Sequence, residues 1–339
     1  MVIKEALAKV VAGENLTADE ARQVMGEIME GEATPAQIGG FLVALRLKKE
    51  TAEEVAGFAR AMRDKAVRFV SRHPVLTDTC GTGGDGAHTF NVSTTAAFVV
   101  AACGCPVAKH GNRSVSSRSG SADLLEALGA KIDLPPAAAG QCLDEIGFGF
   151  FFAPLCHPAM KHVAGPRREL GLRTVFNILG PLCNPAGAQT QVLGVYAPEL
   201  IGLVAEVLAL LGVKRAFVVH GAGGLDELSP AGPAYYAEVN GGAVRREVLD
   251  PADYRIARCS LDALRGGTAA ENAVLTREIL RGKQGPMADT VALNAALALV
   301  AAGKAGDLRE GLSLAREAMA SGAALAKMEE YVAWTRRFN

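Results

Sequence analysis

Two short segments of this chain carry residue types suited to binding phosphate. The first is Gly-Thr-Gly-Gly-Asp at residues 81–85, a loop with few side chains that ends in a carboxylate. Because glycine has no Cβ atom, such a loop can turn tightly at positive φ, and its N–H groups can approach an anion. The second is Lys-His-Gly-Asn-Arg at residues 109–113, which places an ammonium, an imidazole, an amide and a guanidinium on one short loop.

A polar cluster lies between these two segments. Asn-Val-Ser-Thr-Thr at residues 91–95 opens a long apolar run, a pattern typical of the start of a helix. Phosphates favour helix N-termini, since free N–H groups and the positive end of the helix dipole point there. Together the three segments predict one site for a phosphate-rich, metal-bound ligand.

The elements that must position these segments follow from the hydrophobic pattern. Short apolar runs alternate with longer helical stretches, and each run is followed by glycine or proline. This alternation predicts an α/β fold with a mainly parallel central sheet and helices on both faces. Residues 234–240 and 243–249 flank Gly241-Gly242, which predicts a hairpin at the edge of the sheet. The other candidate strands are residues 75–79, 106–109, 148–152, 192–196 and 216–220.

Three loops are then expected at the same edge of the sheet. The glycine-rich segment follows the strand at 75–79, and the basic segment follows the strand at 106–109. A third loop, Gly-Ala-Gly-Gly-Leu-Asp-Glu at 221–227, follows the strand at 216–220. Ligands of such sheets bind beyond the carboxyl ends of the strands. The topology therefore brings the three loops to one site.

The N-terminal part has a different character. Thr17 with Glu20 and Thr51 with Glu54 form capping boxes, and Thr34 precedes a proline at the first position of a helix. These signals predict a small bundle of about four helices. We expect a helical domain at residues 1–72 and an α/β domain at residues 73–339, with the segment around 157–182 packing back on the bundle.

Composition excludes several classes of protein. The chain has 339 residues, enough for two domains or for one domain with an appendage. Its 35 Lys and Arg balance 36 Asp and Glu, which argues against a broad nucleic-acid or membrane surface but not against a local basic pocket. No apolar run is long enough to span a membrane, and the N-terminus does not have the layout of a signal peptide. The seven cysteines form no CxxC pair, so we expect reduced thiols and a cytoplasmic protein.

The two motifs at 81–85 and 109–113, with the later Asp226-Glu227 pair, resemble those of the anthranilate phosphoribosyltransferase family. The resemblance extends over nearly the whole chain, to about residue 330. It implies transfer of the 5-phosphoribosyl group from phosphoribosyl pyrophosphate to the amine of anthranilate, a step of tryptophan biosynthesis that yields N-(5-phosphoribosyl)anthranilate and pyrophosphate. It also implies Mg2+, a homodimer formed through the helical domain, and a site in the cleft between the domains that closes on its substrates.

The resemblance assigns the phosphate and metal ligands residue by residue. Mg2+ is a hard ion that prefers oxygen ligands, and the resemblance gives it Asp226, Glu227 and the hydroxyl of Ser93. The residues expected to contact phosphoribosyl pyrophosphate are Gly81, Gly84, Asp85, Thr89, Asn91, Ser93, Thr94, Lys109, Gly111, Asn112, Arg113, Ser117 and Ser121.

The acceptor requires a cation for its carboxylate. The resemblance points to Arg167, and a guanidinium fork suits a planar carboxylate. Arg168 and Arg173 are close in sequence, and residue chemistry alone does not choose among the three. The resemblance adds Gly81, His110 and Asn112 to the acceptor site.

Lys109 and His110 are the candidate catalytic residues, expected to act by positioning and charge stabilisation. An aniline-type nitrogen is neutral near pH 7 and already nucleophilic, so a strong base is unnecessary. His110 has two open roles. It either takes a proton from the amine, or it has a hydrogen-bonding or structural role.

Other interpretations of the same residues stay open. A glycine-rich segment on its own is more often only a turn. The Asp226-Glu227 pair on its own is compatible with a solvated turn, and Ser121 is compatible with the N-cap of a helix. A pyrimidine nucleoside phosphorylase has a similar architecture but uses phosphate as acceptor; the intact segment at 109–113 and the acidic pair speak against it. An inactive paralogue that binds nucleic acid would have an eroded glycine loop and a basic surface. Residues 1–70 alone are compatible with a helical interaction module.

Overall fold

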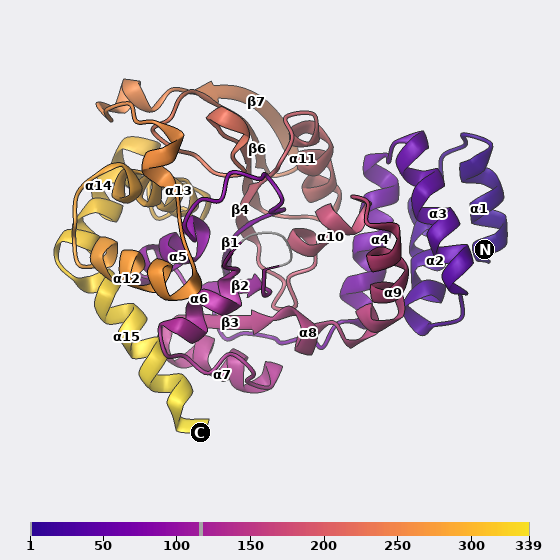
Figure 1. The fold of residues 1–339 in the computed structure, drawn as a ribbon, viewed down its shortest axis with the longest axis horizontal. Coiled ribbons are helices and arrows are strands. Elements are labelled where there is room, and N and C mark those ends of the chain that lie inside the picture. The colour runs from indigo at the N-terminus through magenta and orange to yellow at the C-terminus, as the bar shows by residue number, and fades with distance from the viewer. Residues whose placement is uncertain (1, 115–117, 339) are drawn as a thin grey trace.

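The computed structural model describes residues 2–114 and 118–338, and Figure 1 shows a helical bundle beside a larger α/β part. The helices of the bundle are α1 (Ile3–Val11), α2 (Ala18–Glu30), α3 (Pro35–Lys48) and α4 (Ala52–Lys65). The hydroxyls of Thr17, Thr34 and Thr51 each accept a hydrogen bond from the N–H group three residues later. The predicted bundle and its helix starts are therefore confirmed.

The bundle contains a buried ion pair inside an otherwise apolar core. The rings of Phe41 and Phe58 pack edge to face at 6.0 Å between centroids. The Glu54 side chain is fully buried, and Lys48 Nζ lies 2.9 Å from its Oε2 atom. Its other oxygen accepts a hydrogen bond of 2.9 Å from the N–H of Leu16. Glu54 therefore joins the loop before α2 to the end of α3.

Replacing Glu54 with alanine is expected to lower the free energy of unfolding by about 3–5 kcal/mol, because the change leaves the Lys48 ammonium buried without its partner. Urea unfolding followed by circular dichroism measures the effect. Arg22→Ala is the control, since its pair with Asp64 is exposed and is worth at most about 1 kcal/mol. Equal losses in the two variants would contradict a stabilising role of the buried pair.

The sheet has the order β3-β2-β1-β4-β5-β6-β7. The first five strands of this order are parallel, and β6 and β7 form the antiparallel hairpin expected at the edge. β1 and β2 each reach two residues beyond their predicted ends, since Gly81 pairs with Gly194 and Gly111 with Phe152. β4 lies two residues earlier than predicted. The strands are β1 (Thr77–Gly81), β2 (Val107–Gly111), β3 (Phe148–Phe152), β4 (Thr190–Gly194), β5 (Arg215–His220), β6 (Ala234–Asn240) and β7 (Ala243–Leu249).

Helices cover both faces of the sheet, as predicted. Adjacent residues of one strand point to opposite faces of the sheet and so enter different cores. Val192 of β4 lies in the core that contains α5 (Val92–Ala102) and α13 (Pro286–Ala301). Leu193 lies in the core that contains α11 (Leu200–Leu210). α7 (Pro136–Ile146) packs beside β3. The helices around α5 and α13 are α6 (Ser121–Ala127), α12 (Ala269–Leu280), α14 (Leu308–Ala320) and α15 (Ala323–Thr335).

The helical bundle packs against the α/β part at two places. α4 contacts α11, and the segment after β3 contacts the bundle through α9 (Lys161–Leu170) and α10 (Phe176–Leu182). Val163 and Leu179 of that segment lie in the same apolar cluster as the bundle residues. Pro166 lies inside α9 without ending it. The short α8 (Ala153–Cys156) leads from β3 into this segment. No helix of the described residues is long and apolar enough to cross a membrane.

Candidate active site

The loops that follow β1 and β5 touch each other. The N–H of Gly83 donates a 2.8 Å hydrogen bond to Asp226 Oδ2, although the two residues are far apart in sequence. A Cβ atom on Gly81 would lie 2.4 Å from the same carboxylate oxygen, so this position has no room for a side chain. Gly83 and Gly84 both adopt positive φ, of 62° and 74°. The glycines are therefore required for close approach and for the turn.

Three carboxylates gather at this contact. Burial, followed by the negative charge of Asp85, raises the pKa of Asp226 to about 7. Burial and the charge of Asp226 raise the pKa of Glu227 well above its usual value. Glu227 accepts a 3.3 Å hydrogen bond from the N–H of Ser93, and Asp85 has a buried Oδ2 atom without a partner in the described residues. Partly buried acids crowded in this way are stabilised by a cation.

The donor set fits Mg2+. This ion takes one or two carboxylates and completes its shell with water and substrate phosphates. Asp226 and Glu227 would supply the carboxylates, and Ser93 lies at the start of α5 beside Glu227. The described residues contain no group of three or more His, Cys, Asp or Glu side chains placed to bind one metal ion.

Lys109 lies below this cluster rather than at its surface. The residue is 1% exposed, and its Nζ atom donates a 2.6 Å hydrogen bond to the carbonyl of Thr79. The same atom lies 3.5 Å from the hydroxyl of Ser93. Burial lowers the pKa of Lys109, while the charge of the buried Asp78 raises it. Lys109 therefore places a positive charge beneath the N-terminus of α5 and orients Ser93.

His110 faces a second histidine. The rings of His110 and His157 lie 5.0 Å apart between centroids, and the Nε2 atom of each is buried without a hydrogen-bond partner in the described residues. Burial is the main cause that lowers the pKa of both, and it lowers that of His110 to about 3. An imidazole with so low a pKa is a weak proton acceptor at pH 7. Burial therefore favours the neutral form of His110.

The buried, neutral His110 makes stability depend on pH. An unfolded histidine has a pKa near 6.5, so between pH 6.5 and about 3 the unfolded chain binds a proton that folded His110 does not. Stability is therefore expected to fall as pH decreases through this window. His110→Gln should make the curve of unfolding free energy against pH shallower, by up to about 1.4 kcal/mol per pH unit. Urea unfolding at several pH values between 4 and 7 measures this slope; an unchanged slope would contradict the expectation.

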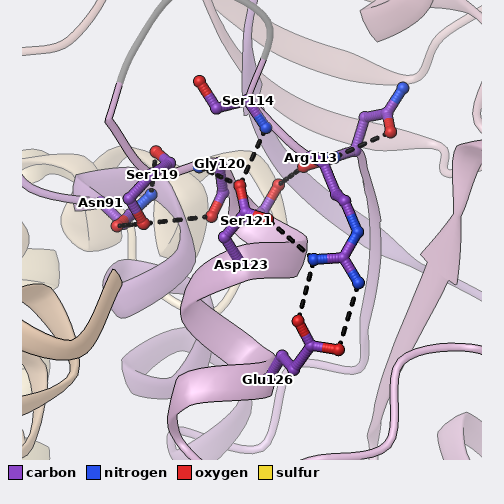
Figure 2. Close-up of polar contacts among 9 residues, drawn as sticks. Asn91, Arg113, Ser114, Ser119, Gly120, Ser121, Asp123 and Glu126 are labelled. Carbon is purple, nitrogen blue, oxygen red and sulfur yellow. Dashed lines mark hydrogen bonds and ion pairs between the residues drawn. The ribbon is translucent and has the colours of Figure 1, made fainter. Parts of the chain in front are cut away.

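The loop after β2 uses two predicted phosphate ligands for contacts within the protein (Figure 2). The Arg113 guanidinium points along α6, where its Nη1 atom lies 2.9 Å from Asp123 and 2.8 Å from Glu126. The Asn91 amide donates to the carbonyl of Ser119 at 3.0 Å, and its Oδ1 atom accepts from the hydroxyl of Ser119 at 3.0 Å. These contacts fix the side chains of Arg113 and Asn91 in this conformation.

The N-terminus of α6 differs from its sequence interpretation. Gly120, not Ser121, is the N-cap, and Ser121 is the first residue of the helix. Asp123 accepts hydrogen bonds from the N–H groups of Gly120 and Ser114, both at 2.9 Å, and so takes the place of a hydroxyl cap (Figure 2). The side chain of Ser121 packs against Gly111. A Cβ atom added to Gly111 would lie 2.4 Å from the Oγ atom of Ser121. Ser117 lies outside the described residues.

The remaining predicted phosphate ligands lie around the same edge. Thr89 Oγ1 lies 3.5 Å from Glu227, Thr94 is buried in the first turn of α5, and Asn112 is exposed beside Arg113. Asp85 accepts a 3.1 Å hydrogen bond from the N–H of Ala87. The structure thus brings most of the predicted residues to the ends of β1, β2 and β5.

The structure separates the three candidate arginines. Arg167 is half-buried with its Cζ atom 5.2 Å from the centroid of the Phe176 ring, and it makes no ion pair in the described residues. Arg168 is exposed on α9. Arg173 donates a hydrogen bond to the carbonyl of Gly84 in the glycine loop. Arg173 also lies over an aromatic ring, that of Tyr196, but it already donates to the glycine loop. Arg167 combines an aromatic contact with a guanidinium that makes no ion pair or hydrogen bond in the described residues.

Sequence reasoning missed the buried Asp78 and the contact between His157 and His110. Asp78 is fully buried and accepts a 2.8 Å hydrogen bond from Asn184, and His157 faces His110. An aspartate inside a strand is unusual, and this signal would have singled out Asp78 as a buried polar centre. Nothing in the sequence pairs His157 with His110, because their contact depends on how α8 leaves the sheet.

Comparisons with known proteins agree with this architecture. Residues 4–66 match the "Glycosyl transferase family, helical bundle domain", and residues 73–325 match the "Glycosyl transferase family, a/b domain". The chain is therefore a glycosyltransferase with both domains of this class.

The relatives define the family more narrowly. The chain is 60% identical to the anthranilate phosphoribosyltransferase of Pelotomaculum thermopropionicum, over 98% of this chain and 97% of that one. The crystal structure of the Thermus thermophilus enzyme superposes with a TM-score of 0.93 at 50% identity, covering 98% and 99% of the two chains. The Saccharomyces cerevisiae enzyme in complex with PRPP and Mg superposes with a TM-score of 0.91 at 29% identity, covering 99% and 98%. The chain belongs to the anthranilate phosphoribosyltransferase family.

Proposed function

We propose that this chain transfers the 5-phosphoribosyl group from phosphoribosyl pyrophosphate to the amine of anthranilate, releasing pyrophosphate, in tryptophan biosynthesis. The observation that carries the proposal is the contact between the glycine loop and the acidic pair, the 2.8 Å hydrogen bond from Gly83 to Asp226. This contact joins a backbone cradle for phosphate to carboxylates for a metal ion. Family membership supplies the acceptor.

The chemistry requires charge stabilisation on two sides of one bond. Breaking the bond from C1′ to the pyrophosphate oxygen builds positive charge on the ribose and negative charge on the leaving group. Mg2+ held by Asp226, Glu227 and Ser93 would neutralise charge on the pyrophosphate. The N–H groups of Thr82 and Gly83 already donate to Gly194 and Asp226, so those of residues 84–85 and of the α5 N-terminus would bind phosphate oxygens. Lys109 adds a buried positive charge nearby.

The acceptor side requires orientation. We assign the anthranilate carboxylate to Arg167, whose guanidinium is already held against Phe176. We also assign Gly81, His110 and Asn112 to the acceptor site, on the family resemblance. The amine is neutral and attacks C1′ with its own lone pair, so positioning supplies most of the catalysis.

We also propose a homodimer formed through the helical domain of residues 1–72, with the α/β domain at residues 73–339. Val2, Val11 and Leu47 are 53%, 69% and 78% exposed on or beside α1 and α3, and this apolar surface supports an interface there. Size-exclusion chromatography with light scattering tests the dimer, with Leu47→Glu as the disrupting variant. We place the enzyme in the cytoplasm, where its free thiols stay reduced.

A fluorescence assay tests the reaction. The protein is mixed with anthranilate, phosphoribosyl pyrophosphate and Mg2+, and loss of anthranilate emission is followed together with pyrophosphate release. A Mg2+-dependent decay supports the proposal. If phosphoribosyl pyrophosphate binds but anthranilate emission does not decay, anthranilate is not the acceptor. If phosphoribosyl pyrophosphate does not bind at all, a phosphorylase or an inactive paralogue is favoured.

A further inference from the structure

Arg173 contacts both the glycine loop and the aromatic ring of Tyr196. It lies between α9 and α10, and its Nη2 atom donates a hydrogen bond to the carbonyl of Gly84. Its Cζ atom lies 4.2 Å from the centroid of the Tyr196 ring, a distance typical of a cation–π contact. The guanidinium is therefore fixed by an aromatic ring on one side and by the loop on the other.

Tyr196 holds the same loop at a second point. Its N–H donates a 3.0 Å hydrogen bond to the hydroxyl of Thr82. The stacked pair of Arg173 and Tyr196 thus contacts the loop at residues 82 and 84, while Asp226 contacts Gly83 between them. Hydrogen bonds at three successive residues determine the conformation of a segment whose glycines would otherwise leave it flexible.

The helical domain reaches this arrangement directly. Arg46, in the last turn of α3, donates a hydrogen bond from Nη1 to the carbonyl of Arg173. A continuous set of contacts therefore runs from α3 through residue 173 to the glycine loop. A movement of the helical domain would shift residue 173, and with it the loop.

We propose that Arg173 is a positioning residue that holds the glycine loop ready for the pyrophosphate of the donor substrate and couples the loop to the position of the helical domain. The inference rests on the proposed function. Gly83, Gly84 and Gly86 all adopt positive φ, so the free loop has many accessible conformations. Ordering the loop before the ligand arrives removes that entropy from the cost of binding.

The first test compares substrate affinities. Arg173→Ala is expected to raise the KM and the calorimetric Kd for phosphoribosyl pyrophosphate about tenfold, as for the loss of one charge-assisted hydrogen bond. The KM for anthranilate at saturating donor should change less than about twofold, because the acceptor carboxylate is assigned to Arg167 and not to Arg173. Arg173→Lys, which keeps a charged donor, should restore part of the affinity. A purely structural role would change both KM values and would not be rescued by lysine.

Arg60→Ala is the matched control. Its Nη2 atom also donates to a backbone carbonyl across the domain junction, that of Leu210 at 2.7 Å, but the contact leads to α11 and not to the glycine loop. The control should leave the donor KM unchanged. Equal donor affinities for Arg173→Ala and Arg60→Ala would overturn the proposal.

A double-mutant cycle tests the coupling to the helical domain. Arg46→Ala alone is expected to raise the donor KM several-fold, and to have no further effect when Arg173 is already alanine. Fully additive losses would overturn the coupling.

The wild-type protein distinguishes this proposal from the proposed function. If wild type does not bind the donor in calorimetry, the proposed function is refuted. If wild type and Arg173→Ala bind the donor equally tightly, only the positioning role is refuted. If Arg173→Ala melts at a lower temperature, Arg173→Gln provides the same comparison.

Discussion

Exchanging both acids of the candidate metal site, Asp226→Asn together with Glu227→Gln, is expected to lower kcat by about two to three orders of magnitude and to weaken the dependence of activity on Mg2+. The physical reason is that the leaving pyrophosphate keeps its full charge when the ion is not held, and electrostatic stabilisation of this kind contributes effects of about that size. Steady-state rates across a Mg2+ titration measure both quantities.

A control pair keeps this test specific. Glu329→Gln with Glu330→Gln removes two adjacent acids from the exposed surface of α15 and should leave the Mg2+ titration unchanged. The active-site variant should also melt at the same or a higher temperature than wild type in Mg2+-free buffer. Its amides remove the crowded charges that raise the pKa values of Asp226 and Glu227. An unaltered Mg2+ titration in that variant would remove both residues from the metal site.

Much of the site was predictable because it depends on topology. Parallel strands present their carboxyl ends at one edge, so the positions of the loops at 81–85, 109–113 and 221–227 follow from the order of apolar runs. The contact between Gly83 and Asp226 joins residues separated by 143 positions, yet the strand pattern alone predicts that their loops meet. Glycine at residues 81 and 83 pointed correctly to close approach and positive φ.

Side-chain directions were not predictable in the same way. The motif at 109–113 suggested that all its polar groups face the ligand, but Arg113 turns toward Asp123 and Glu126 on α6, and Lys109 is buried below the site. Both outcomes depend on neighbours that come from other elements. The contacts of Arg173 with Gly84, and of Arg46 with residue 173, span 89 and 127 positions and depend on how the bundle sits against the sheet. Sequence alone predicts the packing of α9 and α10 only coarsely.

Arg167→Ala is expected to raise the KM for anthranilate roughly 30- to 100-fold, the equivalent of about 2–3 kcal/mol, and to change the KM for phosphoribosyl pyrophosphate by less than about threefold. Only the acceptor carboxylate loses its partner, since Arg167 lies on α9 against Phe176 and makes no hydrogen bond to the glycine loop in the described residues. Arg168→Ala is the matched control, because the neighbouring guanidinium is exposed and makes no ion pair in the described residues. The two KM values are measured in the fluorescence assay.

Aniline separates loss of the carboxylate contact from general damage to the site. It presents the same nucleophile without a carboxylate, so wild type and Arg167→Ala should turn it over at similar, low rates. With anthranilate as the only amine, a misfolded acceptor site and a missing guanidinium would lower turnover in the same way. When both amines are tested, only the missing guanidinium lowers turnover of anthranilate and leaves turnover of aniline unchanged. A loss of the same size for both amines, or equal increases in the KM of donor and acceptor, would refute the assignment of Arg167.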